Sequence, residues 1–172
     1  MAKNINIFLV GLMGAGKTTI GRQIANELSL DFFDSDHEIE NRTGVTITHI
    51  FDIEGEAGFR KRETAMLNEL TEKKGIVLAT GGGAILKPEN RQFLMSRGTT
   101  IYLYANIDTL VERTSKDRNR PLLQTEDPRK KLQELFDIRD PLYRETADII
   151  IDTGKDSVRL AIKEILEKLQ KS

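Results

Sequence analysis

The sequence predicts an α/β domain in which helices cover both faces of a doubly wound, parallel sheet of about five strands, giving three layers. Short apolar runs alternate along the chain with segments whose apolar residues recur at helical spacing. Several of these runs are continuous, which is typical of strands covered on both faces. A third observation is the stretch GLMGAGKTT at residues 11–19, which fits a phosphate-binding loop between a strand and a helix.

Composition indicates one ordinary globular domain spanning residues 1–172, with 31% charged and 38% hydrophobic residues. A net charge of −1 argues against a nucleic-acid partner. No apolar run approaches the roughly 20 residues of a membrane helix, and the N-terminal run is too short for a signal peptide. The absence of cysteine excludes disulfides, thiolate catalysis and Cys-ligated metals. We therefore expect a cytoplasmic protein without a membrane partner. The sequence does not show an oligomeric state, and a monomer is the default expectation.

The strands are expected at residues 5–10, 31–33, 76–79, 100–104 and 148–151. Helix signals separate them. Pro88 suits a first helical turn and Gly98 a helix end, while Asn106 is a good N-cap for a helix reaching about Lys116. Asp127 and Pro128 open a further helix, which is expected to end near Pro141 because proline removes a backbone donor.

The phosphate-binding loop follows the first strand. Gly11, Gly16, Lys17 and Thr18 match the spacing Gly-x-x-x-x-Gly-Lys-[Ser/Thr]. The glycines allow successive backbone N–H groups to form an anion site, and the helix that begins near Gly16 adds the positive end of its dipole. Lys17 is expected to reach the β- and γ-phosphates of a nucleotide, and the Thr18 hydroxyl to bind Mg²⁺.

Polar residues follow the second and third strands, at the edge where such sheets bind ligands. Asp34 is a candidate to hold a water on Mg²⁺, and Asp36 to accept a hydrogen bond, and a proton, from an acceptor hydroxyl. The alternative is that Asp34 or Ser35 only caps the next helix. The run Gly81–Gly83 exposes backbone N–H groups that would bind an anionic or hydroxylated acceptor, or it forms only a tight turn.

Two arginines lie on or beside apolar helix faces. Arg139 shares a face with Leu132 and Phe136, and Arg60 lies one turn before Glu63. The position of each arginine, taken alone, is explained by a structural ion pair or by an extended side chain whose guanidinium reaches solvent. Together with the phosphate loop they favour a small acceptor that carries a carboxylate, since a guanidinium binds a carboxylate bidentately.

A polar stretch, SKDRNRPLLQTE at residues 115–126, lies between two predicted helices. It is either a plain surface loop or a mobile lid over the nucleotide. Two arginines in this stretch favour the lid, which we place at residues 113–126.

The chain resembles the shikimate kinase family over nearly its whole length. The matching pieces, in order, are GLMGAGKTTIGR, FFDSDHEIE, GEAGFRKRE, LATGGGA, RPLL and RDPLYRETAD. The resemblance implies ATP-dependent phosphorylation of the 3-hydroxyl of shikimate, a step of aromatic amino acid biosynthesis through chorismate. It also implies a helical substrate-binding region at about residues 34–62.

The resemblance also implies roles for single residues. Catalytic roles fall to Lys17, Asp36 and Arg120. The implied ATP-binding residues are Gly14, Ala15, Gly16, Lys17, Thr18, Thr19, Arg113, which would lie against the adenine, and Arg120, which would reach the phosphates from the lid. The implied shikimate-binding residues are Asp36, Arg60, Gly81, Gly82, Gly83 and Arg139. Thr18 would bind Mg²⁺, with Asp34 acting through water. Asp156 departs from the family pattern, in which Gln, Arg or Pro is frequent.

Two other functions fit parts of the sequence. A kinase for gluconate or a nucleoside monophosphate shares the phosphate loop, although the Asp-Gly-[Tyr/Phe]-Pro-Arg stretch of adenylate-kinase-like proteins is missing. A GTPase switch would use the Asp-x-x-Gly match at residues 52–55. That match falls inside a predicted helix, and no Asn-Lys-x-Asp guanine motif follows it.

Overall fold

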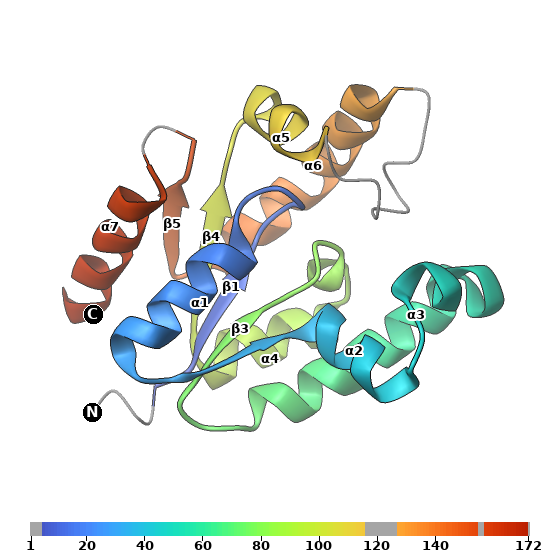
Figure 1. The fold of residues 1–172 in the computed structure, drawn as a ribbon, viewed down its shortest axis with the longest axis horizontal. Helices are drawn as coiled ribbons and strands as arrows, with labels where there is room; N and C mark the ends of the chain where they lie inside the picture. The colour runs from blue at the N-terminus through green and yellow to red at the C-terminus, as the bar shows by residue number, and fades with distance from the viewer. Residues whose placement is uncertain (1–4, 116–126, 155–156, 172) are drawn as a thin grey trace.

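The computed structural model describes residues 5–115, 127–154 and 157–171, which form a sheet of five strands flanked by helices (Figure 1). The strands are β1 (Ile7–Val10), β2 (Asp31–Asp34), β3 (Ile76–Ala79), β4 (Thr99–Tyr104) and β5 (Ile149–Asp152). All neighbouring pairs are parallel, in the order β2-β3-β1-β4-β5. The predicted α/β class and five-stranded parallel sheet are confirmed, with strand bounds within two residues of expectation.

Helices cover both faces of the sheet, which gives the three predicted layers. On one face, α1 (Lys17–Leu28) packs on β1, β2 and β3, and beside it α7 (Val158–Lys171) packs on β5. On the other face lie α3 (Ile47–Thr71), α4 (Pro88–Arg97) and α6 (Pro128–Thr146). The remaining helices are α2 (Ser35–Thr43), η2 (Ala84–Leu86) and α5 (Ile107–Thr114).

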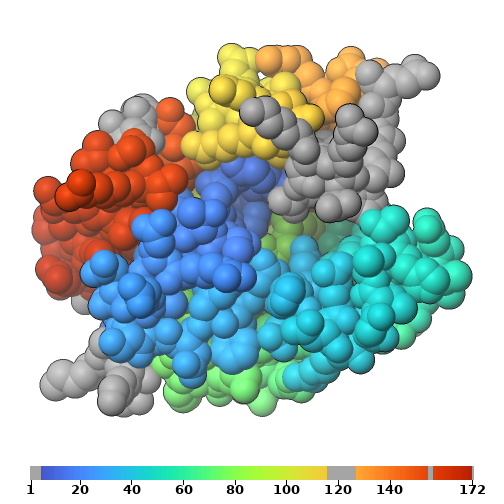
Figure 2. All heavy atoms as spheres, in the orientation of Figure 1, coloured from blue at the N-terminus to red at the C-terminus, as the bar shows by residue number. Residues whose placement is uncertain are grey.

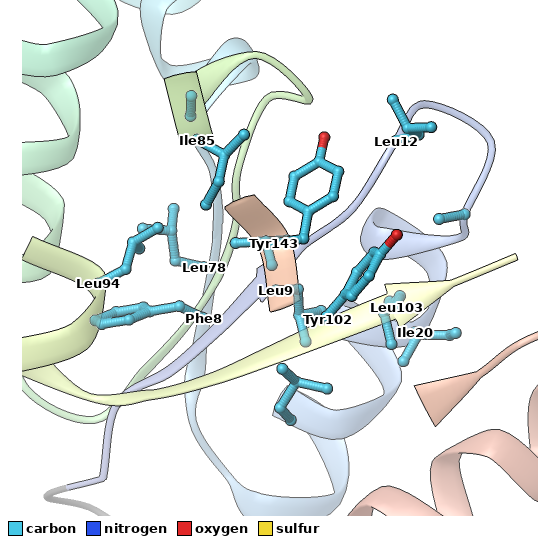
Figure 3. Close-up of a cluster of buried hydrophobic side chains, with 14 of the residues drawn as sticks. Phe8, Leu9, Leu12, Ile20, Leu78, Ile85, Leu94, Tyr102, Leu103 and Tyr143 are labelled. Atoms are coloured by element: carbon cyan, nitrogen blue, oxygen red, sulfur yellow. The ribbon is translucent and has the colours of Figure 1, made fainter. Parts of the chain in front are cut away.

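The core is built around the central strands. Every residue of β1 and β3 is buried, because helices cover these strands on both faces. The rings of Tyr102, from β4, and Tyr143, from α6, lie side by side with centroids 4.8 Å apart (Figure 3). This central packing fixes the carboxyl ends of β1, β2 and β3 next to one another.

Local signals for the helix ends agree with the structure. Asn106 accepts a hydrogen bond from the Thr109 N–H at 2.8 Å, and Asp127 accepts one from the Lys130 N–H at 3.1 Å. Gly98 follows the last residue of α4. The helix after Asn106 ends at Thr114, two residues earlier than expected.

One predicted helix end is wrong. Helix α6 does not stop near Pro141 but continues through it to Thr146. The turn after the proline is held by tertiary contacts, since Tyr143 is 1% exposed and its hydroxyl donates to the Gly82 carbonyl at 2.5 Å. These contacts offset the backbone hydrogen bond that proline removes.

Helix α3 is kinked at Gly55, whose φ of 73° is a left-handed conformation that glycine adopts easily. The Asp-x-x-Gly match at residues 52–55 therefore lies within a kinked helix and follows no strand, as expected. Across the kink, Glu54 and Arg62 form a two-bond ion pair at 2.7 and 2.8 Å. The kink separates the outer part of α3 from the part that carries the buried residues Phe59, Met66, Leu67 and Leu70.

None of the helices in the described residues is both long enough and apolar enough to span a membrane.

Candidate active site

A cleft of about 210 Å³ lies at the carboxyl ends of β1, β2 and β3. Its lining comes from the predicted phosphate loop, the Asp pair and the glycine run. The lining residues are Met13, Gly14, Gly16, Lys17, Thr18, Thr19, Asp34, Asp36, Thr80, Gly81 and Gly82. In the space-filling view, the blue surface of α1 lies between α5 above and α2 with α3 below (Figure 2). Three motifs that are far apart in the sequence thus line one cleft.

The phosphate loop has the geometry its glycines predict. Gly14 and Gly16 have φ values of 89° and 97°, which a residue with a Cβ rarely adopts. Helix α1 begins directly after Gly16, so its first-turn N–H groups and positive dipole end face the cleft. The Lys17 ammonium donates to the carbonyl oxygens of Gly11 at 2.6 Å and Leu12 at 3.0 Å. A cation and backbone donors therefore converge at the mouth of the loop.

Asp34 caps the next helix, as one of its two suggested roles requires, and its second oxygen contacts Thr18. Its Oδ1 accepts hydrogen bonds from the N–H groups of Asp36 at 3.0 Å and His37 at 3.2 Å, which caps α2. Its Oδ2 accepts a hydrogen bond from the Thr18 hydroxyl at 2.9 Å. Because the cap uses only one oxygen, a carboxylate oxygen and a hydroxyl meet beside the phosphate loop.

Each glycine of the run Gly81–Gly83 lies directly against a charged side chain. A Cβ on Gly81 would lie 2.7 Å from Asp36 Oδ1 and 2.9 Å from Glu63 Oε2. A Cβ on Gly82 would lie 3.4 Å from Arg139 Nη1, and one on Gly83 would overlap the guanidinium of Arg60. The glycines thus allow two carboxylates and two guanidiniums to approach one short backbone segment.

The two arginines are buried, with Arg60 8% and Arg139 3% exposed. Arg60 forms ion pairs with Glu63 at 2.9 Å and with Glu56 at 3.2 Å. Burial lowers the pKa of Arg139, and the charge of Arg60 lowers it further. Arg139 Nη1 is buried and has no hydrogen-bond partner among the described residues. A buried guanidinium with an unused donor, close to a second guanidinium, is suited to receive an anion.

Glu63 is the buried acid of this cluster. Its side chain is fully buried, and Oε2 has no hydrogen-bond partner in the described part of the chain. Burial raises the pKa of Glu63 to about 7, against the opposing effect of Arg60, and the charge of Asp36 also raises it. The acid therefore titrates near neutral pH beneath the glycine run.

Arg113, from α5, joins the phosphate loop to the segment after β5. Its guanidinium donates to the Gly14 carbonyl at 3.1 Å and to the Thr153 carbonyl at 2.9 Å. Gly14 also lies close to this helix, because a Cβ there would be 2.8 Å from Thr114 Cγ2. The guanidinium is thus held by its N–H groups at one end of the phosphate loop.

The structure brings the predicted site residues of the described chain to one region. Arg60 and Arg139 do not line the cleft itself but lie against Gly82 and Gly83 at its edge. Arg120, most of the expected lid and Asp156 lie outside the described residues. Sequence reasoning noted Glu63 without giving it a role and missed Tyr143. The helical spacing of Leu132, Phe136, Arg139 and Tyr143 is the signal that marks this tyrosine once α6 continues past Pro141.

Comparisons with known proteins identify the family. A sequence model described as shikimate kinase matches residues 13–170. A shikimate kinase of Ralstonia nicotianae is 61% identical, covering 96% of this chain and 87% of that protein. One from Methylococcus capsulatus is 56% identical, covering 100% and 96%. The structure of a shikimate kinase from Acinetobacter baumannii in complex with shikimate is 54% identical, with a TM-score of 0.95 over 99% of this chain and 95% of that one. The chain belongs to the shikimate kinase family.

Proposed function

We propose that this chain transfers the γ-phosphoryl group of ATP to the 3-hydroxyl of shikimate in the cleft described above, giving shikimate 3-phosphate and ADP. The observation that carries the proposal is the pair of buried guanidiniums, Arg60 and Arg139, which lie against the glycine run. Family membership and the shikimate complex of the Acinetobacter relative support shikimate as the carboxylate-bearing acceptor. The product belongs to aromatic amino acid biosynthesis.

The phosphate loop holds the ATP phosphates in this proposal. Residues 14–19 supply backbone N–H groups, and the Lys17 ammonium moves from the loop carbonyls to the β- and γ-phosphates. Such groups stabilise the charge of the transferring phosphoryl group, which is the main catalytic demand of this reaction. Arg113 lies against the adenine with its face, while its N–H groups keep their carbonyl partners.

Thr18 and Asp34 hold Mg²⁺ in this proposal, Thr18 through its hydroxyl and Asp34 through a water. Both offer oxygen, the ligand that Mg²⁺ prefers, and they lie 2.9 Å apart beside the phosphate loop. Mg²⁺ is usually held by few protein groups together with waters and substrate phosphates, which matches this small donor set. When bound, Mg²⁺ neutralises charge on the β- and γ-phosphates.

The acceptor binds between Asp36 and the two arginines. Arg60 and Arg139 bind its carboxylate, and the N–H groups of Gly81–Gly83 contribute further donors. Asp36 accepts a hydrogen bond from the reacting hydroxyl, orients its oxygen in line with the γ-phosphorus and takes its proton. The new oxygen–phosphorus bond forms as the bond to the β–γ bridging oxygen breaks, and ADP leaves.

Residues 113–126 act as the lid in this proposal, and Arg120 reaches the phosphates when the lid closes. Closure excludes water and so limits ATP hydrolysis without an acceptor. We further propose that the enzyme works as a monomer in the cytoplasm, without a nucleic-acid or membrane partner.

The experiment that tests the proposal is ADP release from Mg·ATP by the purified protein. The acceptors are shikimate, gluconate, AMP, CMP and none, which separate shikimate kinase from the related small-molecule kinases. We expect rapid ADP release with shikimate alone, and loss of most of kcat in Lys17→Ala because the phosphate charge is no longer stabilised. Stimulation by gluconate or AMP instead of shikimate would show that shikimate is not the acceptor. ADP release that is equally fast without any acceptor would contradict transfer to shikimate.

A further inference from the structure

The three carbonyl groups of the glycine run are all hydrogen-bonded, but to different kinds of partner. The Gly81 and Gly83 carbonyls accept bonds from the N–H groups of Ala84 and Leu86, both at 3.1 Å. The Gly82 carbonyl instead accepts a bond of 2.5 Å from the hydroxyl of Tyr143, which belongs to α6. The middle peptide of the run is therefore oriented by a side chain that is 61 residues away in the sequence.

The direction of the Gly82 carbonyl also sets the direction of the next N–H group. A trans peptide is planar, so the Gly82 carbonyl and the Gly83 N–H point in opposite directions. The Gly81 N–H donates to Ser35 Oγ at 3.1 Å, whereas the N–H groups of Gly82 and Gly83 have no partner within the residues that the structure describes. The two donors that remain for an acceptor are thus the ones next to the Tyr143 bond.

A glycine peptide needs such a bond because it rotates easily. Without a Cβ on either side, the Gly82–Gly83 peptide turns over at a smaller steric cost than any other peptide, so the backbone alone does not select one orientation. The Tyr143 hydroxyl is placed firmly enough to select it. Tyr143 is 1% exposed, and its ring packs on that of Tyr102 (Figure 3).

Arg139 lies one helical turn before Tyr143 on α6, so the two side chains project from the same face of the helix. Arg139 Nη1 in turn lies against Gly82. One hydroxyl therefore relates the orientation of the middle glycine peptide to the position of the Arg139 side chain.

We infer that Tyr143 is a positioning residue for the acceptor site: its hydroxyl holds the Gly82–Gly83 peptide and Arg139 in the arrangement that binds the acceptor carboxylate and hydroxyls. The inference rests on the proposed function. Tyr143 touches no reacting atom in this account, so its removal affects acceptor binding and leaves the nucleotide site intact.

The test compares Tyr143→Phe with Tyr102→Phe in steady-state kinetics with shikimate and ATP. The two substitutions are matched, because each removes one hydroxyl from a buried ring of the same stack. The Tyr102 hydroxyl donates to Asp140 Oδ1 at 2.6 Å, away from the glycine run. We expect Tyr143→Phe to raise KM for shikimate by about tenfold, the effect of losing one such bond, and to leave KM for ATP unchanged. Tyr102→Phe should leave both KM values unchanged.

A second measurement follows the backbone of the glycine run directly, first in the unsubstituted protein and then in Tyr143→Phe. The backbone amide resonance of Gly83 should shift on addition of shikimate, and this shift should be smaller in Tyr143→Phe. Equal shikimate KM values in the two variants, a parallel rise in KM for ATP, or an unmoved Gly83 resonance would each overturn the positioning role. Failure of the proposed function looks different, because the unsubstituted protein would then release no ADP with shikimate.

Discussion

At the scale of single residues, the site depends on carboxylates whose two oxygens have different surroundings. Asp34 caps α2 with one oxygen and accepts the Thr18 hydroxyl with the other. Glu63 binds Arg60 through Oε1, while Oε2 is buried beside Asp36 and the backbone of Gly81. The cleft therefore combines a carboxylate that lines it, Asp34, with a carboxyl group that is buried behind it, Glu63.

Glu63 is expected to make the stability of the fold depend on pH. Its pKa is about 7 in the folded protein, whereas the ordinary glutamate pKa, which applies to the unfolded chain, is 4.5. Between these values the folded state binds more protons than the unfolded state. The free energy of unfolding should therefore fall as pH rises through this window, by about 3 kcal/mol if the whole shift is realised. Urea unfolding from about pH 5 to about pH 8 measures this slope.

The matched comparison for this slope is Glu63→Gln against Glu72→Gln. Glutamine at position 63 keeps an oxygen for Arg60 but does not titrate, so the fall in stability should disappear. Glu72 has a side chain that is 64% exposed, and its substitution should leave the slope as it is. If Glu63→Gln and the unsubstituted protein lose stability equally across this range, Glu63 is not the titrating group.

At the scale of elements, α6 is a continuous helix although its sequence contains an interior proline, Pro141. Pro141 is exposed and lies within the helix, so its ring gains little packing while the helix lacks one N–H donor. The last turn persists because Leu142 packs on the core, Tyr143 is fully enclosed and Thr146 is buried. Tertiary contacts thus hold the segment that presents Tyr143 to the glycine run.

Pro141→Ala should therefore stabilise the protein. Alanine restores a backbone donor and avoids the interior proline, which costs about 3 kcal/mol relative to alanine, while the more flexible unfolded chain offsets up to about 1 kcal/mol. We expect the free energy of unfolding to rise by about 1–2 kcal/mol, measured by urea titration. The control is Pro88→Ala, where proline occupies the first turn of α4 and fits. A loss of stability in Pro141→Ala would mean that the proline ring itself is needed.

At the scale of the whole molecule, the strand order decides where the two halves of the site meet. In the order β2-β3-β1, the carboxyl ends of three successive motifs are neighbours, and the phosphate loop faces the Asp pair and the glycine run. Helices α3 and α6, which bring Arg60 and Arg139, come from the same face of the sheet. In the proposed function, the nucleotide and acceptor ends of the cleft are thus built by different elements.

Two ligands that bind different elements should stabilise the fold independently. A ligand at about 100 times its Kd adds about 2.7 kcal/mol, which for a chain of this length raises Tm by roughly 5–10 °C. Both Mg·ATP and shikimate should give such a shift with the unsubstituted protein. In Lys17→Ala the Mg·ATP shift should shrink while the shikimate shift remains, and Arg139→Ala should show the reverse. A variant that loses both shifts while still folded would contradict separate binding elements.

Features that depend on residues close together in the sequence were predicted correctly, whereas a residue placed by long-range contacts was missed. The phosphate loop and the helix caps at Asn106 and Asp127 depend on residues within a few positions, and the structure has them where the pattern predicts. Arg60 and Arg139 are predicted as site residues only in combination, because two arginines beside apolar helix faces occur together with a phosphate loop, an Asp pair and a glycine run. Tyr143 was missed because the helix was predicted to end near Pro141, whereas Tyr143 lies in the turn that follows this proline.

The sequence by itself determined the α/β class, the phosphate loop and the family, because periodicity, glycine spacing and ordered motifs are properties of local sequence. Only the tertiary structure decided that Gly81–Gly83 supports two carboxylates and two guanidiniums, that Asp34 binds with both oxygens, and that the Tyr143 hydroxyl orients the middle glycine peptide. Several of these contacts join residues that are far apart in the sequence, such as Thr18 with Asp34 over 16 positions and Gly82 with Tyr143 over 61. Their energies depend on burial and direction, which exist only once the strands are aligned and the helices are packed.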